Sequence, residues 1–232
     1  MRMRILTALL AVAVASPAIA NDPPLGSRLG ERLKRGESRD NYDALRSAHR
    51  LAECLYFKRG SDVIGALTAL SEAEQKRYQR NLSQSVECRN ATLVDSPRLE
   101  GVAIQAPADV LRGMMAEAVL EKTTKDEALQ PLPAATGGAY QRDWFAITGR
   151  DRTVDEMAVC TAEQNPAGIR DLLATRPESA EELAAVKAVG ATLGPCLPQG
   201  ATLKANRQSL RAALAEALFH RSVEPPLAVT KG

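Results

Sequence analysis

Cysteine is the residue type whose spacing in this chain points most directly to a chemistry. More than thirty residues separate neighbouring cysteines, so they have neither the two-residue spacing of a redox pair nor the short paired spacings of a zinc site. An even number of cysteines in an exported chain predicts disulfides. Because the first and last separations are nearly equal, we expect one disulfide in each half of the chain, Cys54–Cys88 and Cys160–Cys196.

Two pairs of histidine and glutamate have a spacing that could serve a metal ion. His49 and Glu53 are four residues apart, as are Glu216 and His220, so each pair would lie on one helical face. If the two faces met, the four side chains would suit a zinc-like ion. The interpretation we favour is two solvated pairs, each contributing a few tenths of a kcal/mol. We predict no metal site and no cofactor.

The common catalytic motifs of exported enzymes are missing from the sequence. It contains no Gly-x-Ser-x-Gly, Ser-x-x-Lys, His-Glu-x-x-His or P-loop pattern, and only two histidines for acid–base chemistry. Two acid clusters leave open an enzyme that uses carboxylates alone, but acids at helix starts usually stabilise the helix dipole. We therefore predict that the protein is not an enzyme. The clusters are Glu178, Glu181 and Glu182, and Asp151, Asp155 and Glu156.

The first twenty residues have the three parts of a secretory signal peptide. Arg2 and Arg4 precede an apolar run over residues 5–15, and Pro17 and small residues follow. We expect cleavage after Ala20 and a periplasmic or secreted mature protein. No apolar run approaches the roughly 20 residues that span a bilayer, so no membrane span is predicted.

The composition argues against nucleic acid as a partner. Aromatic residues make up 3% of the chain, which leaves few platforms on which bases could stack. Removal of the signal peptide would also remove two arginines and leave equal numbers of basic and acidic residues, so there is no net charge to attract phosphates. A core of Leu, Ala and Val favours helices.

The two halves of the chain share sequence features in the same order. Each has a Ser-x-x-Glu capping box, Ser71 to Glu74 and Ser179 to Glu182, at the same distance before its second cysteine. Each then has a Leu-Arg-x-x-x-Ala-Glu-Ala motif in which the apolar residues fall on one helical face. We therefore predict an all-α protein made of two tandem copies of a multi-helix module, an internal duplication that follows the signal peptide.

Each predicted module contains four helices. The first ends near the first cysteine, at residues 42–58 and 153–164, and a short second helix follows at 61–70 and 166–175. The third runs from the capping box to the second cysteine, and the fourth carries the motif. Around the modules we place a signal peptide (1–20), an N-terminal arm (21–40), module 1 (41–121), a linker (122–141), module 2 (142–223) and a flexible tail (224–232).

The arginine and glutamate of the repeated motif are candidate interaction residues. They are five residues apart and so cannot pair on their own helix. Either they contact a neighbouring helix or a partner protein, or they form a solvated surface, which is the alternative we favour. An aromatic pair after the linker is expected to fill the seam between the modules. The six candidates are Arg112, Glu117, Arg211, Glu216, Trp144 and Phe145.

These features predict an exported, non-catalytic helical protein that acts by protein–protein contact in the cell envelope. The partner protein is unknown, and the sequence sets no oligomeric state. The alternative is a small-molecule or lipid binder with an apolar cleft between the modules, lined by Met114, Met115 and the Trp144–Phe145 pair.

Overall fold

The computed structural model consists of helices and their connections over the residues it describes. These are 27–91, 106–123, 129–135, 140–198, 200–201 and 206–223. The predicted signal peptide and tail lie outside them. Contacts divide the chain into residues 1–39 and 40–232, and every side chain described below belongs to the second unit. In the described part of the chain, no helix combines the length and the apolar character that crossing a membrane requires.

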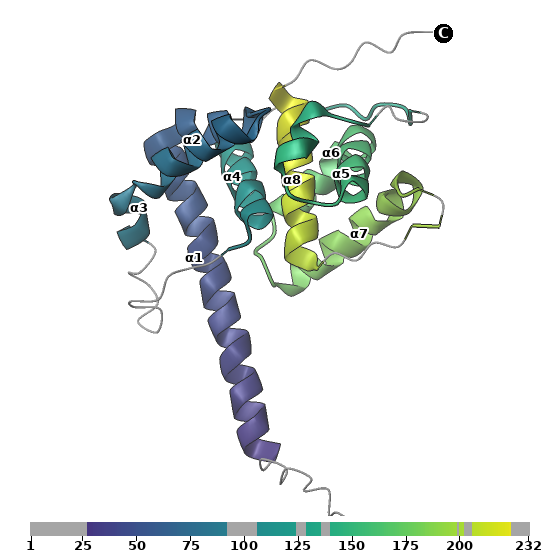
Figure 1. Ribbon diagram of the computed structural model, residues 1–232. Coiled ribbons are helices and arrows are strands. Elements are labelled where there is room, and N and C mark those ends of the chain that lie inside the picture. Colours follow the sequence, from purple (N-terminus) through teal and green to yellow (C-terminus); the bar gives the residue numbers. More distant parts are fainter. Residues whose placement is uncertain are drawn as a thin grey trace, which may run out of the picture. The chain divides into compact units, whose positions relative to one another are not determined.

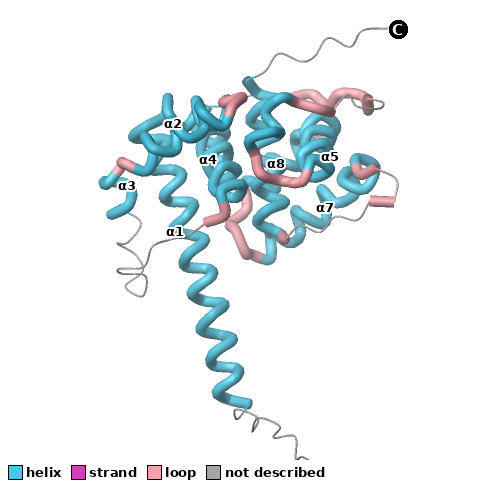
Figure 2. The backbone as a smooth tube through the Cα atoms, in the orientation of Figure 1, coloured by secondary structure: helices cyan, strands magenta, loops and turns pink. Residues whose placement is uncertain are grey.

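The prediction of an all-α protein is confirmed for these residues. Helices α4 and α8 pack side by side, and α8 also packs against α5 and α6 (Figures 1 and 2). The elements in chain order are α1 (Ser27–Thr68), α2 (Glu72–Ser83), α3 (Val86–Ala91), α4 (Ala108–Thr123), the 3-10 helix η1 (Asp143–Ile147), α5 (Arg152–Gln164), α6 (Pro166–Leu173), α7 (Ala180–Cys196) and α8 (Arg207–Val223).

In each half of the chain, one break in the helical backbone separates the first predicted helix from the second. Arg59 interrupts α1 with φ −139° and ψ 40°. Asn165 lies between α5 and α6 with φ −138° and ψ 60°, and its side chain accepts a hydrogen bond from the Gly168 amide. Pro166 follows at the first position of α6, where a missing amide hydrogen costs nothing.

Both capping boxes form, with one difference from the predicted geometry. The Ser71 and Ser179 hydroxyls accept hydrogen bonds from the amides of Glu74 and Glu182, at 3.4 and 3.0 Å. In a standard capping box the glutamate accepts from the amide of the serine itself, but here each glutamate reaches one residue further back. The Glu74 carboxylate accepts from the Leu70 amide at 3.2 Å, and that of Glu182 accepts from the amide preceding Ser179 at 2.8 Å.

The third predicted helix is continuous only in the second half of the chain, as α7. In the first half it is divided into α2 and α3, which corrects the prediction of one helix there. The break falls in a Ser-Gln-Ser sequence. Ser83 donates from its hydroxyl to the Arg80 carbonyl at 2.8 Å, and such side-chain bonds compete with helical ones.

One hydrophobic core contains residues from both halves of the chain. Helices α4 and α8 approach each other closely, since a Cβ added at Gly113 would overlap the backbone of Ala212. The disulfides join Cys54 to Cys88 and Cys160 to Cys196, with Cα atoms 5.4 and 5.6 Å apart. These are the two pairs expected from the sequence.

Candidate functional site

The repeated arginine and glutamate residues form two reciprocal ion pairs between α4 and α8. Arg112 Nε donates to Glu216 Oε1 at 2.9 Å, and Arg211 Nε donates to Glu117 Oε2 at 3.0 Å. Both arginines and Glu216 are buried. The favoured expectation of a solvated surface is therefore wrong, because each arginine reaches the neighbouring helix.

Each of these arginines also caps a helix in its own half of the chain. Arg112 donates to the carbonyls of Ala66 and Leu67 at 2.7 and 3.1 Å. Arg211 donates to the carbonyls of Leu172 and Leu173 at 3.0 and 2.9 Å. The last carbonyls of a helix lack partners within it, so a buried guanidinium satisfies them and complements the helix dipole.

The Arg112–Glu216 pair is extended by two further charged residues, Arg150 and Asp155. Arg150 donates to Glu216 Oε2 at 2.6 Å and to Asp155 Oδ1 at 2.7 Å. Burial alone would raise the pKa of Glu216, but the charges of Arg150 and Arg112 outweigh it and the pKa is lowered. This carboxylate is thus held by two arginines.

The second pair, Arg211–Glu117, has its own additional partner. Arg211 donates to the carboxylate oxygen Glu182 Oε1 at 3.1 Å. The additional side-chain acceptor of Arg112 is instead neutral, the amide oxygen of Gln75 at 3.0 Å. Burial raises the pKa of Glu117 despite its bond to Arg211. Glu182, one of the acids in the predicted carboxylate clusters, both caps α7 and pairs with Arg211.

The two histidine–glutamate pairs have separate surroundings. The His220 ring stacks on Trp144 with centroids 4.1 Å apart, and its Nε2 lies 4.0 Å from Glu216 Oε1. Burial and the nearby charge of Arg211 lower the pKa of His49 to about 4. Among the described side chains, no three His, Cys, Asp or Glu residues are grouped to hold a metal ion.

Trp144 and the two methionines lie in the core, and Phe145 is half-buried against it. The Trp144 and Phe145 rings are nearly perpendicular, with centroids 4.7 Å apart, and Trp144 is buried. Met114 and Met115 are buried as well. Three of the four residues expected to line an apolar cleft, Trp144, Met114 and Met115, are therefore enclosed in the core.

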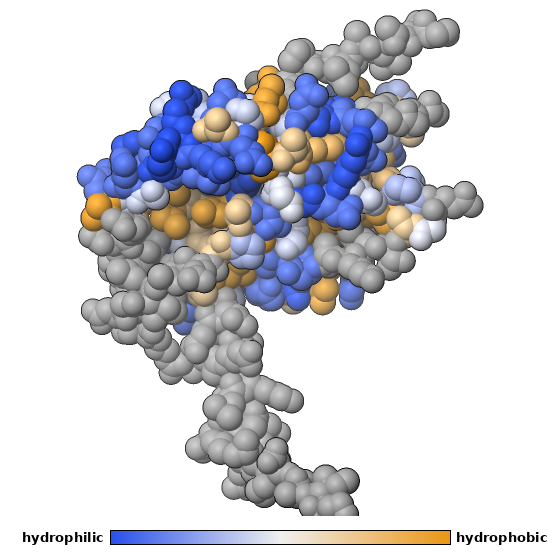
Figure 3. All heavy atoms as spheres, viewed as in Figure 1, coloured by the Kyte–Doolittle hydropathy of each residue, from blue (hydrophilic) through white to orange (hydrophobic). Residues whose placement is uncertain are grey.

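A groove between α1 and α4 is a candidate binding site in the described part of the chain. It encloses about 470 Å³, and the Phe57 side chain in its wall is 82% exposed. On the face shown in Figure 3, hydrophilic residues cover α2 and apolar residues are visible beneath them. The groove is lined by Glu53, Tyr56, Phe57, Gly60 and Ile64 of α1 and by Ala118 and Lys122 of α4.

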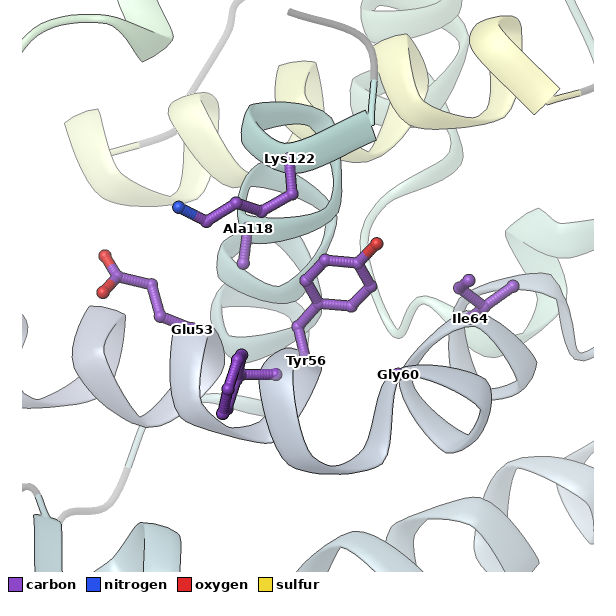
Figure 4. Close-up of a pocket in the computed structure, with 7 residues that line it drawn as sticks. Glu53, Tyr56, Gly60, Ile64, Ala118 and Lys122 are labelled. Atoms are coloured by element: carbon purple, nitrogen blue, oxygen red, sulfur yellow. The ribbon is translucent and has the colours of Figure 1, made fainter.

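One end of the groove is charged and the rest is mainly apolar. The side chains of Glu53 and Lys122 lie at one end, and Ile64 lies toward the other (Figure 4). Burial and the nearby carboxylates of Glu121 and Glu117 raise the pKa of Glu53, while Lys122 lowers it. The site can therefore bind an apolar group and, at the charged end, a polar one.

Sequence reasoning did not identify these lining residues as a site. The available signal was Phe57, one of three phenylalanines, which lies beside the polar residues Lys58 and Arg59. In comparisons with family models, with curated proteins and with solved structures, the chain matches none of them.

Proposed function

We propose that the protein is an exported, non-catalytic helical protein that binds a partner polypeptide in the α1–α4 groove. The observation that carries this proposal is the exposure of Phe57 beside an apolar groove in a chain that is poor in aromatic residues. Burial of such a side chain contributes roughly 2 kcal/mol, which makes it suitable as an anchor for a partner. The two disulfides fit a secreted protein, and periplasmic location after cleavage at Ala20 belongs to the same proposal.

A non-catalytic role is supported by what the buried charged groups do. Glu216, Asp155 and Glu182 accept hydrogen bonds from arginines. Two of these arginines, Arg112 and Arg211, also cap helices. Groups held in this way support the fold.

The proposal includes an internal duplication. Arg112 and Arg211 occupy equivalent motif positions and contact equivalent carbonyls, those of Ala66 and Leu172. The equivalent breaks at Arg59 and Asn165 support the same two-copy design.

Photocrosslinking tests the function. The chain would carry p-benzoylphenylalanine at position 57 or, as the control, at position 183, where Leu183 is 42% exposed on α7. We expect adducts with a polypeptide from position 57 in the cells that produce the protein, and none from position 183. Adducts with lipid alone would support the lipid-binding alternative, which the apolar lining also favours. Equal adducts from both positions, or none, would refute the proposal.

A further inference from the structure

A short stretch of the chain itself lies across α5 and α8. Residues 129–135, Leu-Gln-Pro-Leu-Pro-Ala-Ala, form neither helix nor strand. The Leu132 amide donates to the Glu163 carbonyl at 2.7 Å, and the Arg221 guanidinium donates to the Gln130 carbonyl. Leu129 packs against the core. The segment is thus held through its backbone by the ends of two helices.

The two residues that hold this segment have counterparts in the α1–α4 groove. Glu163 lies two residues before the break at Asn165, as Phe57 lies two residues before the break at Arg59. Arg221 follows the motif of α8 at the same distance as Lys122 follows that of α4.

Phe57 and Lys122 line opposite walls of the groove. The groove in the first half therefore corresponds to the place that residues 129–135 cover in the second half.

We infer that the α1–α4 groove binds an extended, proline-containing apolar segment of another polypeptide, in the way that residues 129–135 lie on α5 and α8. The inference rests on the proposed function, since it names the chemistry of the partner at the same site. It also uses the equivalence of the two halves.

The lining of the groove suits such a segment. Grooves lined by aromatic rings bind proline-rich chains, whose restricted backbone loses little entropy on binding. Tyr56 and Phe57 supply two aromatic side chains, and the Lys122 ammonium can donate to a backbone carbonyl as Arg221 does. The backbone leaves helical geometry at Arg59, and a carbonyl next to this break can accept from an amide of the segment, as the Glu163 carbonyl does in the second half.

A labelled peptide provides the test. The probe is acetyl-Leu-Gln-Pro-Leu-Pro-Ala-Ala-amide with a fluorophore, titrated against the complete oxidised protein and followed by anisotropy. We expect saturable binding that Phe57→Ser weakens at least tenfold and Lys122→Met at least threefold. Leu183→Ser and Lys187→Met, matched changes at exposed positions of α7, should leave the affinity within twofold. A peptide with an N-methylated second leucine lacks the corresponding amide hydrogen and should bind at least fivefold more weakly.

The possible outcomes separate this inference from the proposed function. No saturable binding, or equal binding of the N-methylated peptide, overturns the inference, and polypeptide adducts from position 57 would still uphold the proposed function. Amide NMR shifts on peptide addition that map to Ala162 and Glu163 and not to Tyr56 and Phe57 also overturn it, because the peptide would then only displace residues 129–135. Absence of adducts from position 57 refutes the proposed function whatever the peptide does.

Discussion

Arg112 of α4 and Glu216 of α8 form an ion pair in the interior, where their side chains are 2% and 0% exposed. The same two helices carry the reciprocal pair of Arg211 and Glu117. A buried ion pair is not necessarily stabilising as a whole, but removal of one partner leaves an uncompensated charge. The main effect of the two pairs is therefore to select one alignment of α4 against α8, and their net contribution to the free energy of unfolding is small.

Removal of Arg112 should strongly destabilise the fold. Arg112→Met leaves the Ala66 and Leu67 carbonyls without this donor and deprives Glu216 of one of its two arginines. We expect a loss of about 3–5 kcal/mol in the free energy of unfolding, measured by urea denaturation. The control is Arg152→Met, which breaks an exposed pair with Glu156 and should cost less than about 0.5 kcal/mol. Equal effects of the two substitutions would contradict the structural role given to Arg112.

Substitution of Gly113 by alanine should force α4 and α8 apart. The added methyl would overlap the Ala212 backbone, which cannot move as a flexible side chain would. We expect a destabilisation of about 1–3 kcal/mol. Gly190→Ala in α7 is the matched control. Its methyl meets nothing within 4 Å, so the higher helix propensity of alanine should stabilise the protein by roughly 0.5–1 kcal/mol. Both changes are compared by their urea midpoints, and a neutral Gly113→Ala would argue against the close approach.

Each disulfide should contribute to stability in a similar way. They close loops of 34 and 36 residues, so replacement of either cysteine pair by alanines should cost about 4 kcal/mol in the chain-entropy model. Thermal unfolding of the two double variants should show comparable losses in melting temperature. A variant that melts at the temperature of the unchanged protein would show that its disulfide does not restrict the unfolded chain.

His49 should make stability depend on pH between about 4 and 6.5. Because burial and Arg211 lower its pKa in the folded protein from 6.5 to about 4, the unfolded chain binds the proton more readily. The contribution of His49 is therefore present above pH 6.5 and is lost as the pH falls toward 4, by up to about 3 kcal/mol. His49→Gln removes this dependence. Urea titrations of both proteins across this range should diverge as the pH falls, and parallel curves would disprove the assignment.

Local features were predictable from the sequence because they depend on neighbouring residues. The capping boxes at Ser71 and Ser179 need only a hydroxyl and an amide three residues on. The break at Asn165 is indicated by the proline that follows it, Pro166. The break at Arg59 is indicated by a change in the pattern of apolar residues. The disulfide pairs followed from spacing, since each joins residues of the same half.

The burial of Arg112 and the position of the groove were not predictable in this way. The motif places Arg112 on the flank of its helix, and only the packing of α8 and the end of α1 against it excludes water. The groove likewise depends on how α1 and α4 are spaced, and neither helix shows it alone. Contacts between residues about a hundred positions apart leave no periodic signal in either segment.

The reciprocal pairing of α4 and α8 has a consequence for the chain as a whole. Residues 41–121 alone would keep Arg112 and Glu117 but would lose Glu216 and Arg211, their counterions. Such a fragment could bury these two charges with counterions only by associating with a second molecule, and its folding would then depend on concentration. In the intact polypeptide both counterions belong to the same chain, so the pairing of α4 with α8 does not depend on protein concentration.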